Sequence, residues 1–299
     1  MFSRANILAL LFCRKVLFCV KMVLDELKEK EKLMNTLQAS LLGLIQGLTE
    51  FLPVSSSGHL VILEKVFDIK EGVVFFNIAL HFATLVAVLI VMKDDVIEMI
   101  KHPFSKLTKI VVLATIPTII IGFLFKDMVE DMMHSGVFLG PLFIFCGLSF
   151  ILAEYIGKKR KEKKGIEETK YLDAVGMGVA QGIAIMPAIS RSGFTLSSAL
   201  VLGLKREIAI KISFLMSIPI IVGSSILEVK DMFTPEGVVI GVDILPLVFG
   251  MVVAGLSGYF AIKFMLKIFA KYSLVAFSLY LMPLGALIIL DQFVTHIFF

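Results

Sequence analysis

QGLTEFLPVSSSGH at residues 46–59 and QGIAIMPAISRSG at residues 181–193 are the two stretches that decide the fold of this chain. They align without a gap at an offset of 135 residues, so that two Gln-Gly pairs and two serine-rich turns coincide. Each interrupts an apolar stretch, at 34–67 and at 171–204. A helix, a Pro/Ser/Gly break and a short second helix are typical of a re-entrant hairpin, whose irregular backbone a membrane tolerates only inside protein or against a cavity. We therefore predict two related hairpins.

The remainder of the 299 residues has the composition of a membrane protein. Hydrophobic residues make up 58% of the chain and charged residues 18%, with a mean hydropathy of +0.94. Soluble domains are about half apolar and a quarter charged, so a soluble, disordered or disulfide-stapled protein is excluded. Six further segments are apolar and long enough to cross a bilayer. They are 73–92, 107–125, 137–156, 208–227, 244–262 and 273–290.

The distribution of lysine predicts the orientation. The densest basic run, KKRKEKK at 158–164, marks the cytoplasmic side. Counting spans outward from it places the lysine-rich segments 93–109, 205–211 and 263–271 on the same side. The basic residues lie in loops rather than along a stripe with interleaved aromatics, so we expect membrane lipids and not nucleic acid as partners.

An odd number of spans, three, separates the hairpins, so they must enter the membrane from opposite sides. The sequence thus predicts an all-α integral membrane protein, with six transmembrane helices and two re-entrant helical hairpins arranged as an inverted repeat whose tips meet near the midplane. The first repeat is 34–157, the basic cytoplasmic loop 158–170 and the second repeat 171–299. Residues 1–33 fit neither repeat, and we expect a surface-lying amphipathic helix or a poorly ordered extension.

Ionisable groups in both breaks are candidates for chemistry. Gln46 and Glu50 are four residues apart and share a helix face, and His59 follows the serines. Placing a carboxylate in a membrane costs at least about 2.5 kcal/mol, so such a group usually has a function. Arg191 in the second break is the natural partner of Glu50 across the pseudo-twofold axis. His81, within a span, is expected to have a structural role.

Hydroxyls surround these groups. The serine and threonine residues of the two breaks are Ser55, Ser56, Ser57, Ser190, Ser192 and Thr195. Hydroxyls and backbone N–H groups beside a glycine and a helix start suit an anion, and a guanidinium matches phosphate oxygens bidentately. A phosphate or diphosphate ligand is favoured over a small carboxylate.

The first stretch, Gln46 to His59, resembles the first signature of the undecaprenyl-diphosphate phosphatase family, also called bacitracin-resistance proteins, and PAISRSGFT at 187–195 resembles the second. Similarity covers nearly everything from Met34 onward. Gln46 stands where many members carry Glu, and Ala188 replaces the usual Gly after Pro.

The resemblance implies hydrolysis of a C55 polyprenyl diphosphate to the monophosphate, which recycles the lipid carrier of cell-wall synthesis, at a site open to the outer face of the cell membrane. It implies Glu50, Ser56, His59 and Arg191 as catalytic residues, with Ser56 or His59 as nucleophile or acid/base. The substrate-binding residues would be Ser55, Ser57, Ser190, Ser192 and Thr195. Gln46 and Glu50 would bind a divalent metal, Mg²⁺ or Ca²⁺.

Some alternatives stay open at this stage. The nucleophile is Ser56, His59 or an activated water, of which we favour Ser56. Inverted repeats with broken helices also build secondary transporters, so a polyprenyl-phosphate transporter is the alternative function. A homodimer is also left open.

Overall fold

The computed structural model describes residues 34–299 except 70–71, 161–162, 235–236, 239–241 and 268–271, so the prediction for residues 1–33 lies outside the described residues. The described chain is helical apart from one pair of two-residue strands, β1 (Phe233–Thr234) and β2 (Gly237–Val238). The helices are α2 (Thr36–Phe51), α3 (Ser56–Phe67), α4 (Val73–Val91), α5 (Lys93–Lys101), α6 (Lys106–Leu124), α7 (Lys126–Ser135), α8 (Leu139–Lys159), α9 (Tyr171–Ile183), α10 (Arg191–Val201), α11 (Arg206–Met232), α12 (Ile244–Lys267), α13 (Val275–Leu290) and the π-helical η2 (Asp291–Thr295).

The all-helical membrane fold is confirmed. Six helices are long and apolar enough to cross a membrane, and they fall on the six predicted segments. The largest difference is at α11, which begins two residues earlier and ends five residues later than the predicted 208–227. The short helices α5 and α7 were not predicted, because charged residues make them too polar to stand out as spans.

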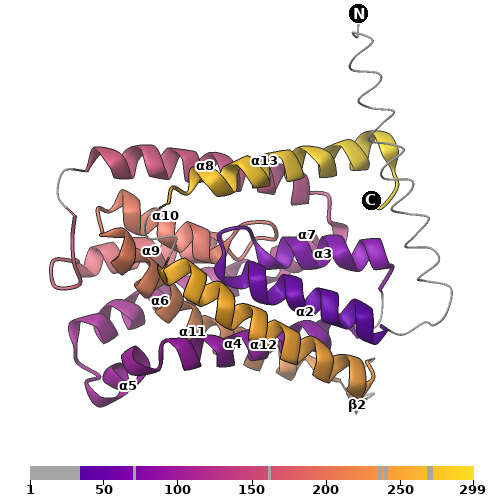
Figure 1. Ribbon diagram of the computed structural model, residues 1–299, viewed down its shortest axis with the longest axis horizontal. Coiled ribbons are helices and arrows are strands. Elements are labelled where there is room, and N and C mark those ends of the chain that lie inside the picture. Colours follow the sequence, from indigo (N-terminus) through magenta and orange to yellow (C-terminus); the bar gives the residue numbers. More distant parts are fainter. Residues whose placement is uncertain (1–33, 70–71, 161–162, 235–236, 239–241, 268–271) are drawn as a thin grey trace, which may run out of the picture.

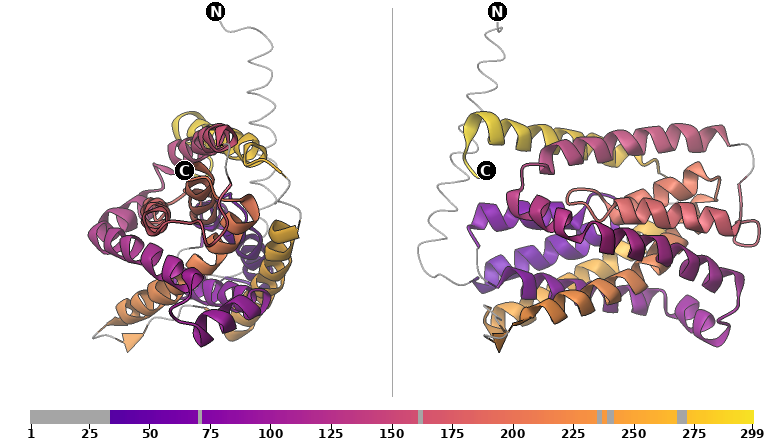
Figure 2. Two further views of the ribbon diagram at one scale, coloured as in Figure 1. Left: turned by 90° about the vertical axis from the view of Figure 1, so that its left-hand side faces the viewer. Right: turned by 180° about the vertical axis from the view of Figure 1, so that it is seen from behind.

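The two hairpins lie at opposite ends of the long axis of the molecule. Figure 1 shows α2 and α3 on the right and α9 and α10 on the left, with their turns meeting in the middle. The pair α8 and α13 lies along one side of them, whereas α4, α6, α11 and α12 lie along the other, as the view from behind confirms (Figure 2). This arrangement is compatible with the predicted inverted repeat, which stays a prediction.

The first arm of each hairpin packs on a helix from the other half of the chain. Helix α2 packs on α12, and helix α9 packs on α6. Glycine permits this close approach, since a β-carbon on Gly43 would lie 2.2 Å from the carbonyl oxygen of Gly250, and one on Gly178 would lie 2.1 Å from that of Ala114. The two halves are therefore interlocked rather than stacked.

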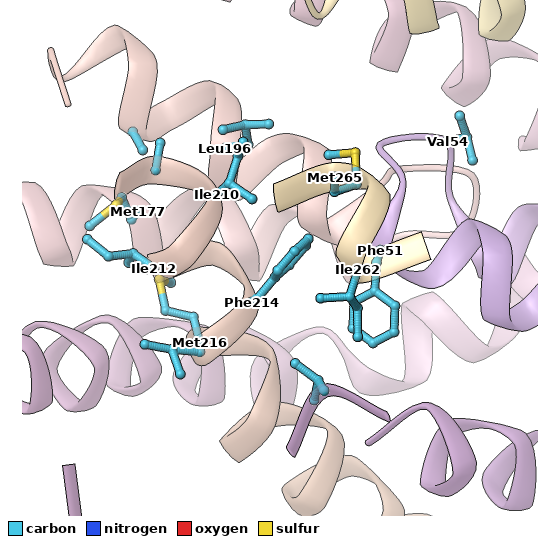
Figure 3. Close-up of a cluster of buried hydrophobic side chains, with 14 of the residues drawn as sticks. Phe51, Val54, Met177, Leu196, Ile210, Ile212, Phe214, Met216, Ile262 and Met265 are labelled. Carbon is cyan, nitrogen blue, oxygen red and sulfur yellow. The ribbon is translucent and has the colours of Figure 1, made fainter. Parts of the chain in front are cut away.

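The main hydrophobic core lies beside the turn of the first hairpin. Phe51, the last residue of α2, packs edge-to-face on Phe214 of α11, with 5.5 Å between ring centroids. Figure 3 shows both rings together with Ile262 and Met265 of α12. Burying an aromatic ring stabilises a fold by about 1.5–3 kcal/mol, so this contact fixes the end of α2 and, with it, the preceding Glu50.

Candidate active site

The two turns are capped in the same way. In the first, Ser55 is the N-cap of α3, and its Oγ accepts from the Gly58 N–H at 3.3 Å and lies 3.4 Å from Ser57 Oγ. In the second, Ser190 is the N-cap of α10, and its Oγ accepts from the Gly193 N–H at 3.2 Å and lies 3.3 Å from Ser192 Oγ. Serine is a preferred N-cap because its oxygen satisfies an otherwise unpaired backbone donor. The 135-residue alignment therefore extends to individual hydrogen bonds.

The turns also fit into each other. A β-carbon on Gly58 would lie 2.9 Å from Cα of Ala188, and one on Gly193 would lie 2.9 Å from Cβ of Pro53. Both pairs join a helix-start glycine of one hairpin to a residue within the break of the other, and Pro53 and Ala188 are equivalent at the offset of 135 residues. In addition, Ser192 Oγ donates to the carbonyl oxygen of Leu52 at 3.2 Å. The tips thus meet, as the sequence predicted.

One residue with a side chain adopts a left-handed backbone conformation in each turn. Ser55 has φ 70° and Ala188 has φ 64°. Such angles cost a residue other than glycine roughly 1–2 kcal/mol and persist where surrounding contacts hold them, often at functional sites. The Gly-to-Ala difference noted at Ala188 therefore falls where glycine is conformationally preferred.

Glu50 is the centre of the site. Its side chain is 2% exposed and forms an ion pair through Oε1 with Nη2 of Arg191, whose side chain is 20% exposed. Its Oε2 accepts from Ser56 Oγ at 2.6 Å and from Gln46 Nε2 at 3.0 Å. The predicted acid, guanidinium, amide and one serine therefore lie in a single cluster contributed by both hairpins. Breaking such a buried pair typically costs about 3–5 kcal/mol.

The histidine that approaches Glu50 is His81 and not His59. His81 of α4 lies with Nε2 3.7 Å from Glu50 Oε2 and is 28% exposed. His59 is turned toward α13: its Nδ1 donates to the Ser55 carbonyl oxygen at 2.6 Å, and its Nε2 lies within hydrogen-bond distance, 2.7 Å, of the Tyr280 hydroxyl. No hydrogen bond joins His59 to Ser56 in the described part of the chain. The prediction that His59 acts as acid or base on Ser56 thus gains no support from this geometry.

The remaining predicted residues surround the cluster. Ser57 and Ser192 are partly exposed at the turns, whereas Ser190 is buried as a cap. Thr195 is 1% exposed, and its hydroxyl donates to the Arg191 carbonyl oxygen at 2.8 Å, so it shapes the first turn of α10. Ser57 and Ser192 thus remain partly accessible at the turns, whereas Thr195 is buried within α10.

The electrostatics of the turns favour an anion. Helices α3 and α10 both begin here, at Ser56 and Arg191. A helix N-terminus carries about half a positive elementary charge and presents unpaired N–H groups. Together with the Arg191 guanidinium, they outweigh the single carboxylate of Glu50, so the turns carry a net positive charge.

The metal prediction meets a limited set of donors. Among the residues that the structure describes, no group of three or more His, Cys, Asp or Glu side chains is arranged to hold a metal. The Oε1 atom of Gln46 is buried and has no hydrogen-bond partner, and it lies on the residue that also donates to Glu50. One amide and one carboxylate oxygen fit Mg²⁺ or Ca²⁺, provided that phosphate oxygens supply most of the remaining ligands.

Sequence reasoning did not assign functional contacts to His81 and Tyr280. The signal for His81 was present, since Asn77, His81 and Thr84 share one face of a span, and a polar face in a membrane helix must contact something polar. Tyr280 had no such signal, because 221 residues separate it from His59.

Comparison with known proteins gives a consistent result. The family model described as bacitracin resistance protein BacA matches residues 39–287. The undecaprenyl-diphosphatase of Carboxydothermus hydrogenoformans is 49% identical over 259 residues, which cover 87% of this chain and 98% of that protein. Undecaprenyl-diphosphatase 4 of Bacillus thuringiensis is 42% identical over 265 residues, 89% of this chain and all of that protein, and the undecaprenyl-diphosphatase of Halothermothrix orenii is 39% identical over 259 residues. Since these matches span most of the chain and the same helices and turns, the chain belongs to the family of the bacitracin resistance protein BacA.

Proposed function

We propose that this chain is an integral membrane phosphatase that hydrolyses undecaprenyl diphosphate to undecaprenyl monophosphate and inorganic phosphate. The observation that carries the proposal is the cluster at Glu50, where a serine hydroxyl 2.6 Å from the carboxylate faces a guanidinium from the opposite hairpin. The relatives aligned over nearly their whole length are named undecaprenyl-diphosphatases. The chain would thereby recycle a lipid carrier of cell-wall synthesis.

Ser56 is the proposed nucleophile and Glu50 its base. A nucleophile hydrogen-bonded to a carboxylate has the arrangement that general-base activation requires. Ser56 Oγ would attack the terminal phosphorus while its proton passes to Glu50 Oε2. The bond from that phosphorus to the bridging oxygen would break, and the bridging oxygen would leave on the polyprenyl monophosphate. Water would then hydrolyse the phosphoserine and release inorganic phosphate.

Arg191 and the two helix starts would hold the terminal phosphate. The structure records no protein acceptor for the Arg191 guanidinium other than Glu50 among the described residues, so its remaining N–H groups are available to phosphate oxygens. In phosphoryl transfer, catalysis consists mainly of positioning and of charge stabilisation at the equatorial oxygens.

Three supporting roles complete the proposal. Gln46 Oε1 and Glu50 would hold a divalent metal, which would supply positive charge against the diphosphate. His81 would orient Glu50. His59 would fix the turn, because its Nδ1–H binds the carbonyl of Ser55, the residue before the nucleophile.

We place the opening of the site on the outer side of the membrane, since the basic run at 158–164 marks the inner side. The transporter alternative is not supported, because the relatives that match nearly the whole chain are named undecaprenyl-diphosphatases. Release of phosphate is also what a phosphatase, and not a transporter, must show in detergent.

The test is phosphate release from C55 diphosphate by purified full-length protein. Ser56→Ala should reduce the rate by about 10³-fold or more and abolish labelling of the protein by a substrate with a radioactive terminal phosphate. Ser40→Ala is the matched control, since Ser40 lies on the same hairpin and its hydroxyl only donates to the Thr36 carbonyl. Chelation of divalent metal should stop release by the wild type.

Two results would count against the proposal. Phosphoenzyme labelling that persists in Ser56→Ala would remove Ser56 as nucleophile. Wild-type protein that binds the diphosphate without releasing phosphate, with Mg²⁺ or Ca²⁺ present, would defeat the phosphatase itself.

A further inference from the structure

A cavity lined by both polar and apolar side chains lies away from Glu50, at the end of the bundle that carries the basic run. Its volume is about 540 Å³, within the range of small-ligand pockets. Residues from the end of α8, the end of α10 and the start of α11 line it, together with Lys163 and with Tyr272 and Ser273 before α13. It shares no lining residue with the candidate active site.

The lining of this cavity is strongly cationic. Lys158, Lys163, Lys205 and Arg206 face one carboxylate, that of Glu154. That carboxylate is already engaged, because it accepts from Arg206 Nη2 at 2.7 and 2.8 Å and from the backbone N–H of Leu274 at 3.1 Å. It is 4% exposed, so little of its charge reaches the opening. Lys158 Nζ also lies 3.8 Å from Glu154 Oε1, so four cationic side chains share this one carboxylate and the lining keeps an excess of positive charge.

The position of the cavity indicates which anion it takes. Lys158 lies in the last turn of the α8 span, so the cavity is at the level where a bilayer presents its headgroups. Buried Leu200 and Leu204 form apolar lining, and Tyr272, 60% exposed, lies at the edge. Cations above apolar side chains and an interfacial tyrosine suit an amphiphile that has a phosphate and an acyl chain.

We propose that this cavity binds the headgroup phosphate of an anionic phospholipid from the leaflet on the side of the basic run. Lys158 of α8 and Lys205, just before α11, contact the phosphate, and Lys163 is held by donating to the Gly157 carbonyl at 2.6 Å. Basic pockets between membrane helices on the cytoplasmic side are established binding sites for such headgroups. The proposal does not depend on the reaction at Glu50.

The test is a titration of the full-length protein in a zwitterionic detergent, followed by native mass spectrometry and by the thermal unfolding midpoint. The probes are dihexanoyl phosphatidylglycerol, dihexanoyl phosphatidylcholine and inorganic phosphate. Lys158→Gln and Lys205→Gln remove cavity charges one at a time and together. Lys109→Gln removes one exposed charge from the first turn of α6, outside the cavity, and is the matched control.

We expect saturable binding of phosphatidylglycerol, with about fivefold weaker affinity for each lysine removed and no change in Lys109→Gln. Phosphatidylcholine and inorganic phosphate should bind at least tenfold more weakly. Equal binding of phosphatidylcholine, or equal loss in Lys109→Gln, would overturn the proposal. Inorganic phosphate that binds as tightly as the lipid would replace it with a free-anion site. If the double variant unfolds, the single variants decide the matter.

Discussion

The two hairpins share a frame but carry different chemistry. Their serine caps and their helix-start glycines occupy equivalent positions and make equivalent contacts. At the offset of 135 residues, however, Glu50 corresponds to Ile185, Ser56 to Arg191 and His59 to Phe194. Even the buried glutamines differ in partner, since Gln46 donates to a carboxylate and Gln181 to the hydroxyl of Thr118. The shared caps and glycines thus bring the two turns together, whereas the residues that differ between the hairpins supply the charged groups of the cluster.

The largest expected effect comes from exchanging the charges between the hairpins. Glu50→Arg and Arg191→Glu should each lower the unfolding free energy by about 3–5 kcal/mol, since each buries an unpaired charge. The double exchange restores an ion pair and should recover most of that stability. Phosphate release should stay about 10³-fold below wild type, because the proposed base and the proposed phosphate-binding guanidinium are then each on the other hairpin.

Thermal unfolding in detergent and phosphate release measure the two effects separately. Recovery of both in the exchanged protein would show that the pair is structural and that the asymmetry has no catalytic meaning.

The frame itself is tested by the glycines. Gly58→Ala and Gly193→Ala should each destabilise the protein by about 1–3 kcal/mol, because the added methyl groups meet Phe143 and Phe150 at 2.5 and 2.2 Å. Gly122→Ala is the control, since no atom of the described residues outside its own helix backbone and chain neighbours lies within 4 Å of the added β-carbon. Midpoints of thermal unfolding give the comparison. A shift for one glycine without the other would mean that the turns are not equivalent.

A smaller effect is expected at His81. The same offset aligns His81 with Met216, so His81→Met makes the first half resemble the second. Loss of one polar contact to Glu50 should lower kcat/KM about five- to tenfold, whereas His81→Gln keeps a donor and should lose less. Exposed His102 provides the control His102→Met. If Met and Gln have the same effect, the contact with Glu50 is not used.

The smallest effect concerns the backbone of the second turn. Ala188→Gly should raise the unfolding free energy by up to about 1 kcal/mol, since glycine adopts φ 64° without steric cost but loses more entropy on folding. Ala180→Gly, inside α9, should instead lower it by about 0.5–1 kcal/mol. Chemical unfolding monitored by circular dichroism distinguishes the signs, and a destabilised Ala188→Gly would contradict the assignment of strain.

Much of this fold could be predicted from the sequence, because a membrane restricts the structures that a chain can adopt. Apolar length gave the six spans, and the gapless alignment of Pro/Ser/Gly breaks gave the meeting of Glu50 with Arg191. Both depend on local patterns or on an internal repeat, which need no knowledge of the tertiary structure.

The orientation of individual side chains could not be predicted from the sequence. His59 follows the serines in sequence, yet its ring hydrogen-bonds with Tyr280, whereas His81 on a separate helix approaches Glu50. Which of the two histidines faces the carboxylate depends on how α3 and α4 are rotated about their axes. Packing within the bundle sets that rotation, and the sequence does not show it. The cationic cavity could not be predicted from the sequence either, because its lysines come from three separate segments that only the tertiary structure brings together.

The exchange of packing partners between the halves has a consequence for the making of the protein. Helix α2 leaves the ribosome before the other described helices, but it packs on α12, which ends at Lys267. Arg191, the ion-pair partner of Glu50, is likewise translated 141 residues later. The first hairpin can therefore reach its final position only near the end of translation, and the first half of the chain alone lacks both of these contacts.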